Sequence, residues 1–297
     1  MSEPDVVIAP AVGVHKRING YGATISTEDD PSPDTTTEEY AGEQSEANVR
    51  KTLDYILPLA QSIRARTVLD VGCGIGTMVR TLLDKGYDAY GTDLLGLERY
   101  WSRQDLPRDR FFIVGAGDTR LPFRSSSVDF AFTLGVIEHV GTSNGHSDRL
   151  PDYREIRRRW LLELLRVVRV GGCALIGGPN RSFPVDAAHG LDSKASVIER
   201  TLSRFAGVSI HKPWGENFLW SYGDLRGLLD GLPLQIEPVS IRGYVGFSRV
   251  PRWLRPAVEA YVDLLPRFLL GTGFNPWMMA LIRKTGTLPN EVSNDPS

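Results

Sequence analysis

Residues Thr67–Asp93, TVLDVGCGIGTMVRTLLDKGYDAYGTD, contain the pattern that decides the fold. The apolar run at 68–71 is short and partly β-branched, as in a buried parallel strand. Glycines follow at alternate positions: Gly72, Gly74 and Gly76. Because glycine has no Cβ atom, this spacing predicts a tight turn in which the backbone can approach a ligand closely.

The rest of the stretch completes a unit of strand, turn, helix and strand. Apolar residues recur at helical spacing over 78–83, and Gly86 is placed to end that helix. A second strand over 88–92 then leads into Asp93. This order is typical of the nucleotide-binding half of a doubly wound sheet, in which the carboxylate accepts hydrogen bonds from both hydroxyls of a ribose.

The glycine spacing separates two classes of ligand. Dinucleotide sites favour G-x-G-x-x-G, with a pyrophosphate at the helix N-terminus. This chain has D-V-G-C-G-I-G, with Asp70 two residues before the first glycine. A carboxylate there would repel a pyrophosphate but would help to hold an ammonium group. The pattern therefore predicts a ligand with a ribose and an amino-acid end and without phosphate; a glycine turn with no ligand is the alternative.

The stretch resembles motif I of the class I S-adenosylmethionine-dependent methyltransferases, which implies S-adenosylmethionine as the cofactor. In that family an acid after the third strand typically binds the adenine amino group, and Asp118 follows a predicted strand over 111–114. A helix over 46–63 is expected to cover the cofactor; Tyr40 and Arg50 are candidate contacts to its carboxylate end, or else a surface tyrosine and a solvated arginine. The resemblance implies these cofactor contacts: Asp70, Gly72, Cys73, Gly74, Gly76, Asp93, Leu94, Gly117, Asp118, Thr119, Leu134, Tyr40 and Arg50.

A second motif, GVIEHV at 135–140, follows the fourth predicted strand. It resembles the E-H-V signature of the ubiquinone- and menaquinone-pathway methyltransferases. His139 titrates near neutrality, so it is a candidate base, or it holds its loop by hydrogen bonds. In the ubiquinone O-methyltransferases an E-x-x-E-H run can bind a divalent metal, but Gly135 stands here in place of the first acid. No metal is therefore expected.

The segment 178–190, GPNRSFPVDAAHG, leaves the fifth predicted strand at the ligand edge of the sheet. A similar Pro-Asn-Arg-x-Phe-Pro segment occurs in methyltransferases of glycan, lipid and secondary-metabolite pathways. His189 is placed to remove a hydroxyl proton, and Asp186 to orient it or stabilise its charge. The alternative is that the pair binds substrate or fastens the loop.

Arginines recur in a predicted helix over 152–169, at positions 154, 157, 158, 159, 166 and 169. Glutamates are interleaved with them, and most of the arginines lie opposite the apolar stripe of the helix. A solvated helix face is therefore favoured over a nucleic-acid patch.

The composition supports the same reading. The chain has 297 residues, of which 41% are hydrophobic and 24% charged, as in ordinary globular proteins. A formal net charge of −2 argues against a nucleic-acid partner. The two cysteines fit a reducing compartment, and the sequence shows no signal-peptide or transmembrane pattern, so a cytoplasmic location is expected.

We expect an α/β fold with a Rossmann-like, seven-stranded doubly wound sheet, a helical N-terminal cover and C-terminal insertions. One methyltransferase domain is predicted over 41–285, between a flexible segment at 1–40 and a polar tail at 286–297. The substrate-side insertions are predicted at about 141–152, 181–220 and 250–273. The apolar part of the last, 250–270, is suited to cover an amphiphilic substrate, to form a homodimer face or to touch a membrane surface.

The predicted function is methyl transfer from S-adenosylmethionine to a small-molecule, sugar or lipid-linked acceptor in a biosynthetic pathway. A hydroxyl acceptor is favoured because a histidine and acids lie on the substrate edge. C- or N-methylation of a secondary metabolite or quinone and a non-catalytic, cofactor-binding regulatory role are the alternatives. A nicotinamide-dependent oxidoreductase is disfavoured by Asp70 and by the glycine spacing.

Overall fold

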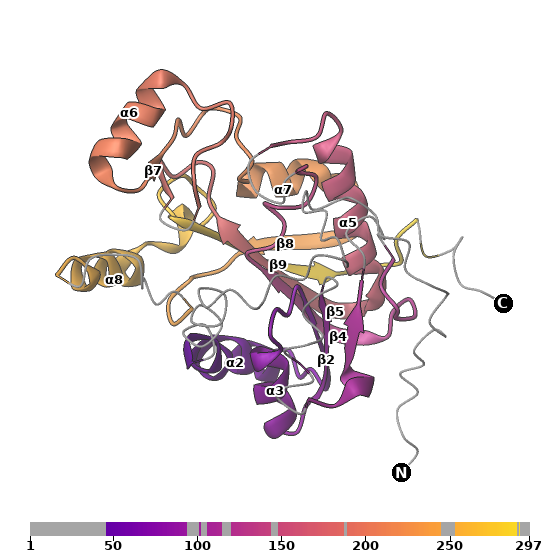
Figure 1. The fold of residues 1–297 in the computed structure, drawn as a ribbon. Helices are drawn as coiled ribbons and strands as arrows, with labels where there is room; N and C mark the ends of the chain where they lie inside the picture. The colour runs from indigo at the N-terminus through magenta and orange to yellow at the C-terminus, as the bar shows by residue number, and fades with distance from the viewer. Residues whose placement is uncertain are drawn as a thin grey trace, which may run out of the picture.

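The computed structural model describes residues 46–93, 101, 106–114, 120–143, 148–186, 189–244, 253–289 and 291. Its centre is a seven-stranded sheet in the order β3-β2-β1-β4-β5-β9-β8 (Figure 1). The strands in chain order are β1 (Thr67–Val71), β2 (Asp88–Asp93), β3 (Phe111–Ile113), β4 (Val128–Leu134), β5 (Val168–Pro179), β8 (Leu234–Pro238) and β9 (Trp277–Lys284). The predicted seven-stranded α/β sheet is confirmed.

The order of the strands reverses between β1 and β4. Strand β1 pairs in parallel with β2 on one side and with β4 on the other. Strand β9 pairs antiparallel with both β5 and β8. In such a sheet the connections from β1 and β4 leave in opposite directions, which opens a ligand crevice beyond their carboxyl ends. The glycine turn and the GVIEHV motif both lie at these ends.

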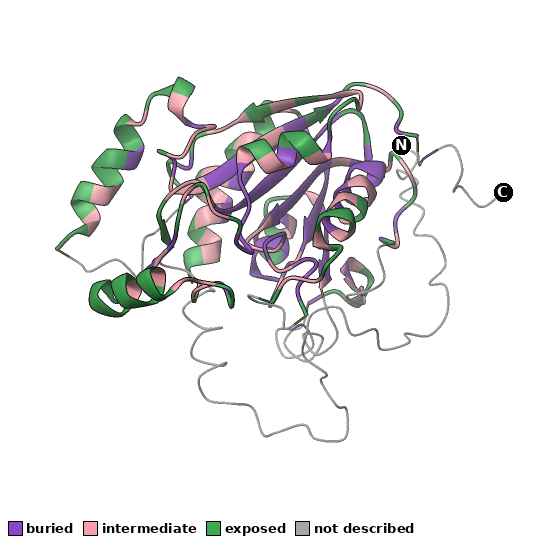
Figure 2. Cartoon of the chain, turned by 90° about the horizontal axis from the view of Figure 1, so that it is seen from above, coloured by how far each residue is buried: buried purple, intermediate pink, exposed green. Residues whose placement is uncertain are grey.

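Helices cover both faces of the sheet, so each face has its own apolar core. On one face, α5 (Tyr153–Val167) and α7 (Tyr222–Leu228) pack on residues such as Leu69 and Ile176. On the other, α2 (Leu57–Ser62) and α3 (Thr77–Asp84) pack on residues such as Val68 and Leu175. Because both faces are covered, every residue of β1 is buried, including Thr67 and Asp70 among its apolar neighbours. Figure 2 shows the central strands as mostly buried.

Three short helical turns complete the described elements: η1 (Thr52–Ile56), η2 (Arg108–Arg110) and η3 (Arg267–Leu269). The first of them, η1, connects a helical stretch at 46–51 to α2. Some boundaries differ from the predicted ones. Helix α5 ends at Val167 rather than at 169, and β5 begins directly after it, because Val168 already pairs with Val128 of β4.

The expectation of a solvated arginine face on α5 is wrong for Arg157 and Arg166, which are buried. Arg166 donates to the carbonyl oxygens of Leu121 and Phe123 and pairs with Glu163. Arg166 lies opposite the apolar stripe, whereas Arg157 lies within it, four residues after Tyr153 and three before Trp160. Carbonyl oxygens of neighbouring loops accept hydrogen bonds from both side chains.

The segment expected to be a polar tail also packs on the domain where it is described. Leu288 is fully buried, and Glu291 pairs with the buried Lys284. Lys284 donates in addition to the carbonyl oxygens of Leu165 and Val168, where α5 ends. Burial lowers the pKa of Lys284, while Glu291 opposes that shift.

Two excursions extend beyond the sheet. The first contains a small hairpin of β6 (Val185–Asp186) and β7 (Ser209–Ile210) with α6 (Val197–Ala206) between its strands, within the insertion predicted at 181–220. The second contains α8 (Arg255–Leu264), within the one predicted at 250–273. Both helices project on the left of Figure 1.

Among the described residues, no helix combines the length and the apolar character that crossing a membrane requires.

Candidate active site

The glycine turn after β1 closes one side of the crevice. Gly72 and Gly74 have φ angles of +89° and +54°, in the left-handed region that favours glycine. A Cβ atom at Gly72 would overlap Val136, so the turn packs directly on the GVIEHV motif. A Cβ atom at Gly74 would meet no described residue within 4 Å, so the Cα of Gly74 faces open space within the described part of the chain. The Gly74 carbonyl oxygen accepts a hydrogen bond of 2.8 Å from the indole N–H of Trp101.

Two buried or partly buried acids flank this open space. Asp93, at the end of β2, accepts a hydrogen bond of 2.5 Å from the Gly74 amide. Burial raises the pKa of Asp70 well above its usual value, and the charge of Asp93 raises it further. Two neighbouring acids in such surroundings are stabilised by positive charge on a ligand. The glycine turn beside these two acids therefore fits a ligand that has a ribose and an ammonium end.

Other predicted cofactor contacts lie in different settings. Cys73 is buried and packs toward Gly91 of β2, and Leu134 ends β4 at the same edge of the sheet. Arg50 lies on the exposed surface of the N-terminal helical stretch and pairs with Glu46 at 3.8 Å. No contact described in the structure joins Arg50 to the glycine turn. The remaining predicted contacts lie outside the described residues: Tyr40, Leu94, Gly117, Asp118 and Thr119.

The three predicted catalytic residues come together with a fourth that the prediction did not include. His189 Nδ1 lies 3.0 Å from Asp186 Oδ2, and His189 Nε2 lies 3.8 Å from Glu138 Oε1. The rings of His139 and His189 are 5.1 Å apart, centroid to centroid. Glu138 stands directly before His139 in the E-H-V motif, so the sequence carried a signal for it.

Glu138 is fully buried, and neither of its carboxylate oxygens has a hydrogen-bond partner on another described residue. Gly178 makes the space for it: a Cβ atom there would lie 2.8 Å from Glu138 Oε2 and 2.8 Å from Trp220 Nε1. Burial raises the pKa of Glu138 to about 7, although the nearby His189 favours the charged form.

Arg157 of α5 fixes the backbone around this carboxylate. Its guanidinium donates to the carbonyl oxygens of Glu138 at 2.8 Å, Val140 at 3.0 Å and Phe218 at 2.5 Å. One buried side chain therefore joins the loop after β4 to the aromatic segment before α7. No local pattern around Arg157 indicates this role, because its three partners lie outside α5.

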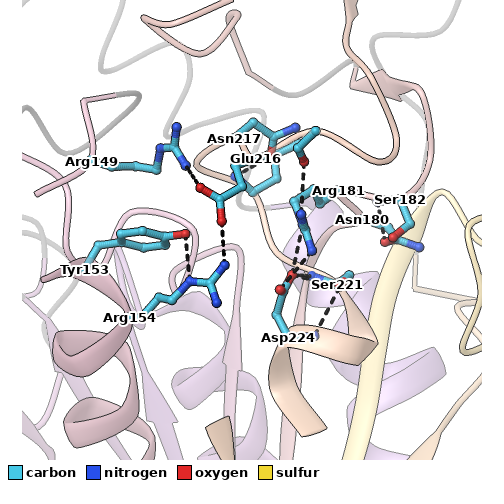
Figure 3. Close-up of polar contacts among 12 residues, drawn as sticks. Arg149, Tyr153, Arg154, Asn180, Arg181, Ser182, Glu216, Asn217, Ser221 and Asp224 are labelled. Atoms are coloured by element: carbon cyan, nitrogen blue, oxygen red, sulfur yellow. Dashed lines mark hydrogen bonds and ion pairs between the residues drawn. The ribbon is translucent and has the colours of Figure 1, made fainter. Parts of the chain in front are cut away.

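A polar network holds the loop that carries Asp186 and His189 (Figure 3). Arg181 binds Asp224 of α7 through two hydrogen bonds of 2.9 and 3.0 Å and donates to the Gly215 carbonyl oxygen. Asn180 donates to the carbonyl oxygens of Thr272 and Asn275. The start of the loop is thereby attached to both later segments of the substrate half.

A second part of the network lies beside the first in Figure 3. Arg154 donates to Glu216 at 2.7 Å, and Arg149 lies 3.7 Å from the same carboxylate. Arg149 also lies 3.5 Å from Asp192, just beyond His189. These ion pairs connect Arg154 of α5 and Arg149, which precedes α5, to the segments that carry Glu216 and Asp192.

Tyr244 lies between the two groups of acids and was not predicted. It is buried, its ring centroid is 5.5 Å from that of Tyr55, and Lys51 lies over its face. Burial raises its pKa, and the charges of Glu138 and Asp70 contribute to the shift. The N-terminal helical stretch therefore reaches the crevice through Lys51 and Tyr55.

Comparison with known proteins agrees with this geometry. Residues 69–176 match the sequence model of a family described as a methyltransferase domain. A search among curated proteins finds no significant match.

Solved structures with a similar chain path include three methyltransferases. The methyltransferase domain of a bacterial CtHen1 protein shows 18% identity and a TM-score of 0.46, with 81% of this chain and 100% of that chain covered. A SAM-dependent methyltransferase from Aquifex aeolicus shows 15% identity and a TM-score of 0.41, with 70% and 94% covered. One from Mesorhizobium loti shows 16% identity and a TM-score of 0.40, with 75% and 96% covered.

At TM-scores below 0.5 the likeness is loose, so the assignment rests on the family match and on the sheet. The match begins within β1 and ends within β5, and it spans both the glycine turn and the GVIEHV motif. The strand order places these two motifs side by side at the switch point of the sheet. Over residues 69–176 the chain therefore carries a methyltransferase domain, its sheet has the strand order of the class I S-adenosylmethionine-dependent methyltransferases, and both findings support S-adenosylmethionine as the cofactor.

Proposed function

We propose that this methyltransferase transfers the methyl group to a hydroxyl oxygen of a small or lipid-linked acceptor, and that the acceptor hydroxyl is activated beside His189. The observation that carries the proposal is the Asp186–His189 pair, with Nδ1 and Oδ2 3.0 Å apart. A hydroxyl must lose its proton during transfer, whereas carbon and nitrogen acceptors need less help. A histidine oriented by a carboxylate suits that task.

S-adenosylmethionine supplies an electrophilic sulfonium methyl group when it is bound. We propose that Asp93 binds the ribose hydroxyls and that Asp70 faces the ammonium end. The Gly74 amide holds the Asp93 carboxylate beside the open face of the turn, which supports the first role. The raised pKa of Asp70 supports the second, because the positive charge of the cofactor would offset the burial of two acids.

On the acceptor side, the residues position the oxygen and exclude water. The Asp186 carboxylate sets the orientation of the His189 ring, so that Nε2 faces Glu138. The ring of Phe218 packs edge-on against His189 at 5.7 Å. In-line positioning within an enclosed site is the main contribution that a protein makes to transfer from an already activated donor.

The exposed apolar side chains on the two projecting helices, α6 and α8, support the proposal that the acceptor is amphiphilic or that the enzyme contacts a lipid surface. Helix α6 has no buried residue, yet one side of it carries four large apolar side chains: Val197, Ile198, Leu202 and Phe205. Around α8, Trp253, Leu264 and Phe268 are each about four-fifths exposed. Basic residues lie on α6, at Arg200 and Arg204, and beyond its two ends, at Lys194 and Lys212. Apolar side chains next to basic ones suit an anionic lipid surface.

The direct test is a screen of hydroxylated sugars, lipids and phenols with methyl-labelled cofactor, followed by the His189→Ala variant. We expect the variant to lose about 10²- to 10⁴-fold in turnover, as for other positioned proton acceptors. Its affinity for S-adenosylhomocysteine, measured by calorimetry, should stay within about twofold of the parent value. Unchanged turnover on a hydroxyl acceptor would refute the role of His189, and transfer only to carbon or nitrogen would refute the acceptor class.

A further inference from the structure

Three side chains that can ligate a metal meet at one point of the crevice. Glu138, His139 and His189 each offer one ligand atom, and the three atoms lie within 4.8 Å of one another. Ligands about 2.1 Å from a common ion lie up to about 4.2 Å apart. A shift of less than an ångström would therefore bring the three atoms onto one ion.

The buried carboxylate of Glu138 points to a positively charged partner. It is fully buried, and its two oxygens have no hydrogen bond to another described residue. A buried carboxylate without such bonds is costly unless a cation compensates it. Arg157 is the nearest buried guanidinium named above, but it donates to the backbone carbonyl of Glu138 rather than to the carboxylate.

The neighbouring residues have the arrangement found around metal-binding histidines. Asp186 lies 3.0 Å from Nδ1 of His189, and this contact leaves Nε2 facing Glu138. A ligating histidine commonly donates its other ring N–H to a carboxylate, which fixes the tautomer and the orientation of the ring. The Asp186–His189–Glu138 arrangement therefore serves a metal ion as well as it serves a proton.

We propose that Glu138, His139 and His189 bind one divalent transition-metal ion, with Asp186 orienting His189. This inference deepens the proposed function, since the ion would stand where the acceptor hydroxyl is activated. Gly135 stands where the E-x-x-E-H run has its first acid, and for that reason no metal was expected from the sequence. In the fold His189, from a loop fifty residues farther along, comes next to Glu138 and His139 and completes a set of three.

The donor set limits the choice of ion. Two imidazoles and one carboxylate suit Mn²⁺, Fe²⁺ or Zn²⁺ better than Mg²⁺, which prefers oxygen ligands. Such an ion would place positive charge beside an acceptor hydroxyl and so lower the pKa of that hydroxyl, with its proton released to solvent as the acceptor binds, before the site is enclosed. With the ion bound, His189 would activate the hydroxyl through the ion, in place of direct proton transfer to the imidazole.

The test is calorimetric titration of the EDTA-treated full chain with MnCl₂, backed by the Mn²⁺ signal in electron paramagnetic resonance. We expect saturable binding of one ion per chain. The near-isosteric Glu138→Gln should weaken binding at least about 100-fold, and Asp186→Asn about 10- to 100-fold, as for other orienting residues. Glu155→Gln, which removes an exposed carboxylate from α5, is the control and should bind Mn²⁺ as the parent does.

Absence of saturable binding, or equal binding by Glu138→Gln and the parent, would overturn the proposal. Retained affinity of Glu138→Gln for S-adenosylhomocysteine shows that the variant is folded. The two proposals can fail separately. Hydroxyl methylation that persists without metal binding leaves the proposed function standing, whereas metal binding without any hydroxyl acceptor removes only the proposed function.

Discussion

The two halves of the crevice are built in different ways. The cofactor half is almost local: β1, the glycine turn, α3 and β2 occupy 27 consecutive residues, Thr67 to Asp93. The acceptor half is assembled from distant parts, since Glu138, His189 and Phe218 meet only through the loops after β4 and β5 and the segment before α7. A local motif carries its geometry in its own spacing, whereas an assembled site depends on the residues that join its parts. The four experiments below test that difference.

The largest effect is expected at Arg157, the residue that joins two parts of the acceptor half. Arg157→Met keeps the apolar stem but leaves three buried carbonyl oxygens without their donor. We expect a loss of about 3–5 kcal/mol in the free energy of unfolding, measured by denaturant titration. Arg158→Met on the same helix is the control. A loss below about 1 kcal/mol for Arg157→Met would show that the acceptor half does not depend on this contact.

The next effect concerns the cofactor half. Asp93→Ala removes the carboxylate that the Gly74 amide holds beside the open face of the turn. Leaving the ribose hydroxyls unpaired should weaken the affinity for S-adenosylmethionine by about 1.5–3 kcal/mol, roughly 10- to 100-fold in calorimetry. Asp84→Ala, on the exposed end of α3, is the control. If Asp93→Ala binds S-adenosylmethionine as tightly as the parent does, Asp93 does not bind the ribose hydroxyls.

A comparison of two glycines separates packing from ligand access within the turn. Gly72→Ala forces a methyl group against Val136, whereas Gly74→Ala meets no neighbour within 4 Å. Both carry the strain of a left-handed backbone, so the difference reports the collision. We expect Gly72→Ala to be less stable than Gly74→Ala by about 1–3 kcal/mol in thermal or chemical unfolding. Equal free energies of unfolding for the two variants would mean that the GVIEHV segment can move away from the added methyl group at little cost.

The smallest effect on stability is expected at the surface of α6. Phe205→Glu replaces a side chain that is 87% exposed, so the free energy of unfolding should change by less than about 0.5 kcal/mol. Cosedimentation with anionic phosphatidylserine vesicles should nevertheless fall several-fold relative to the parent. Thr201→Glu, on the same helix, controls for the added charge. If the parent chain does not bind vesicles at all, the lipid contact is excluded.

The difference between a local cofactor half and an assembled acceptor half also explains which parts of the site could be predicted from the sequence. The spacing alone was enough to predict that Asp70, Asp93 and the glycines lie at the carboxyl ends of adjacent strands. The sequence also placed Asp186 and His189 on one loop at the ligand edge, where they lie together. The roles of these residues stay predictions. Glu138 was not included, since only the fold buries its carboxylate and brings His189 beside it.

Helical periodicity assigns each residue to a face of its helix but does not say what covers that face. On α5 the side chains of Arg157 and Arg166 lie against loops, so charges that were expected to be solvated are buried. On α6 no residue is buried, and among the described residues nothing covers its apolar side.

The contact between Gly72 and Val136 has a consequence for the order of binding. No side chain separates the cofactor turn from the segment that carries Glu138 and His139, so a small movement of that segment on acceptor binding would be felt at the turn. The affinities for cofactor and acceptor are then linked, and the linkage is reciprocal: an acceptor that favours S-adenosylmethionine is itself bound more tightly when that cofactor is present. A spent cofactor that fits the shifted turn less well would leave more readily, so turnover would be set by the fit between two loops rather than by either site alone.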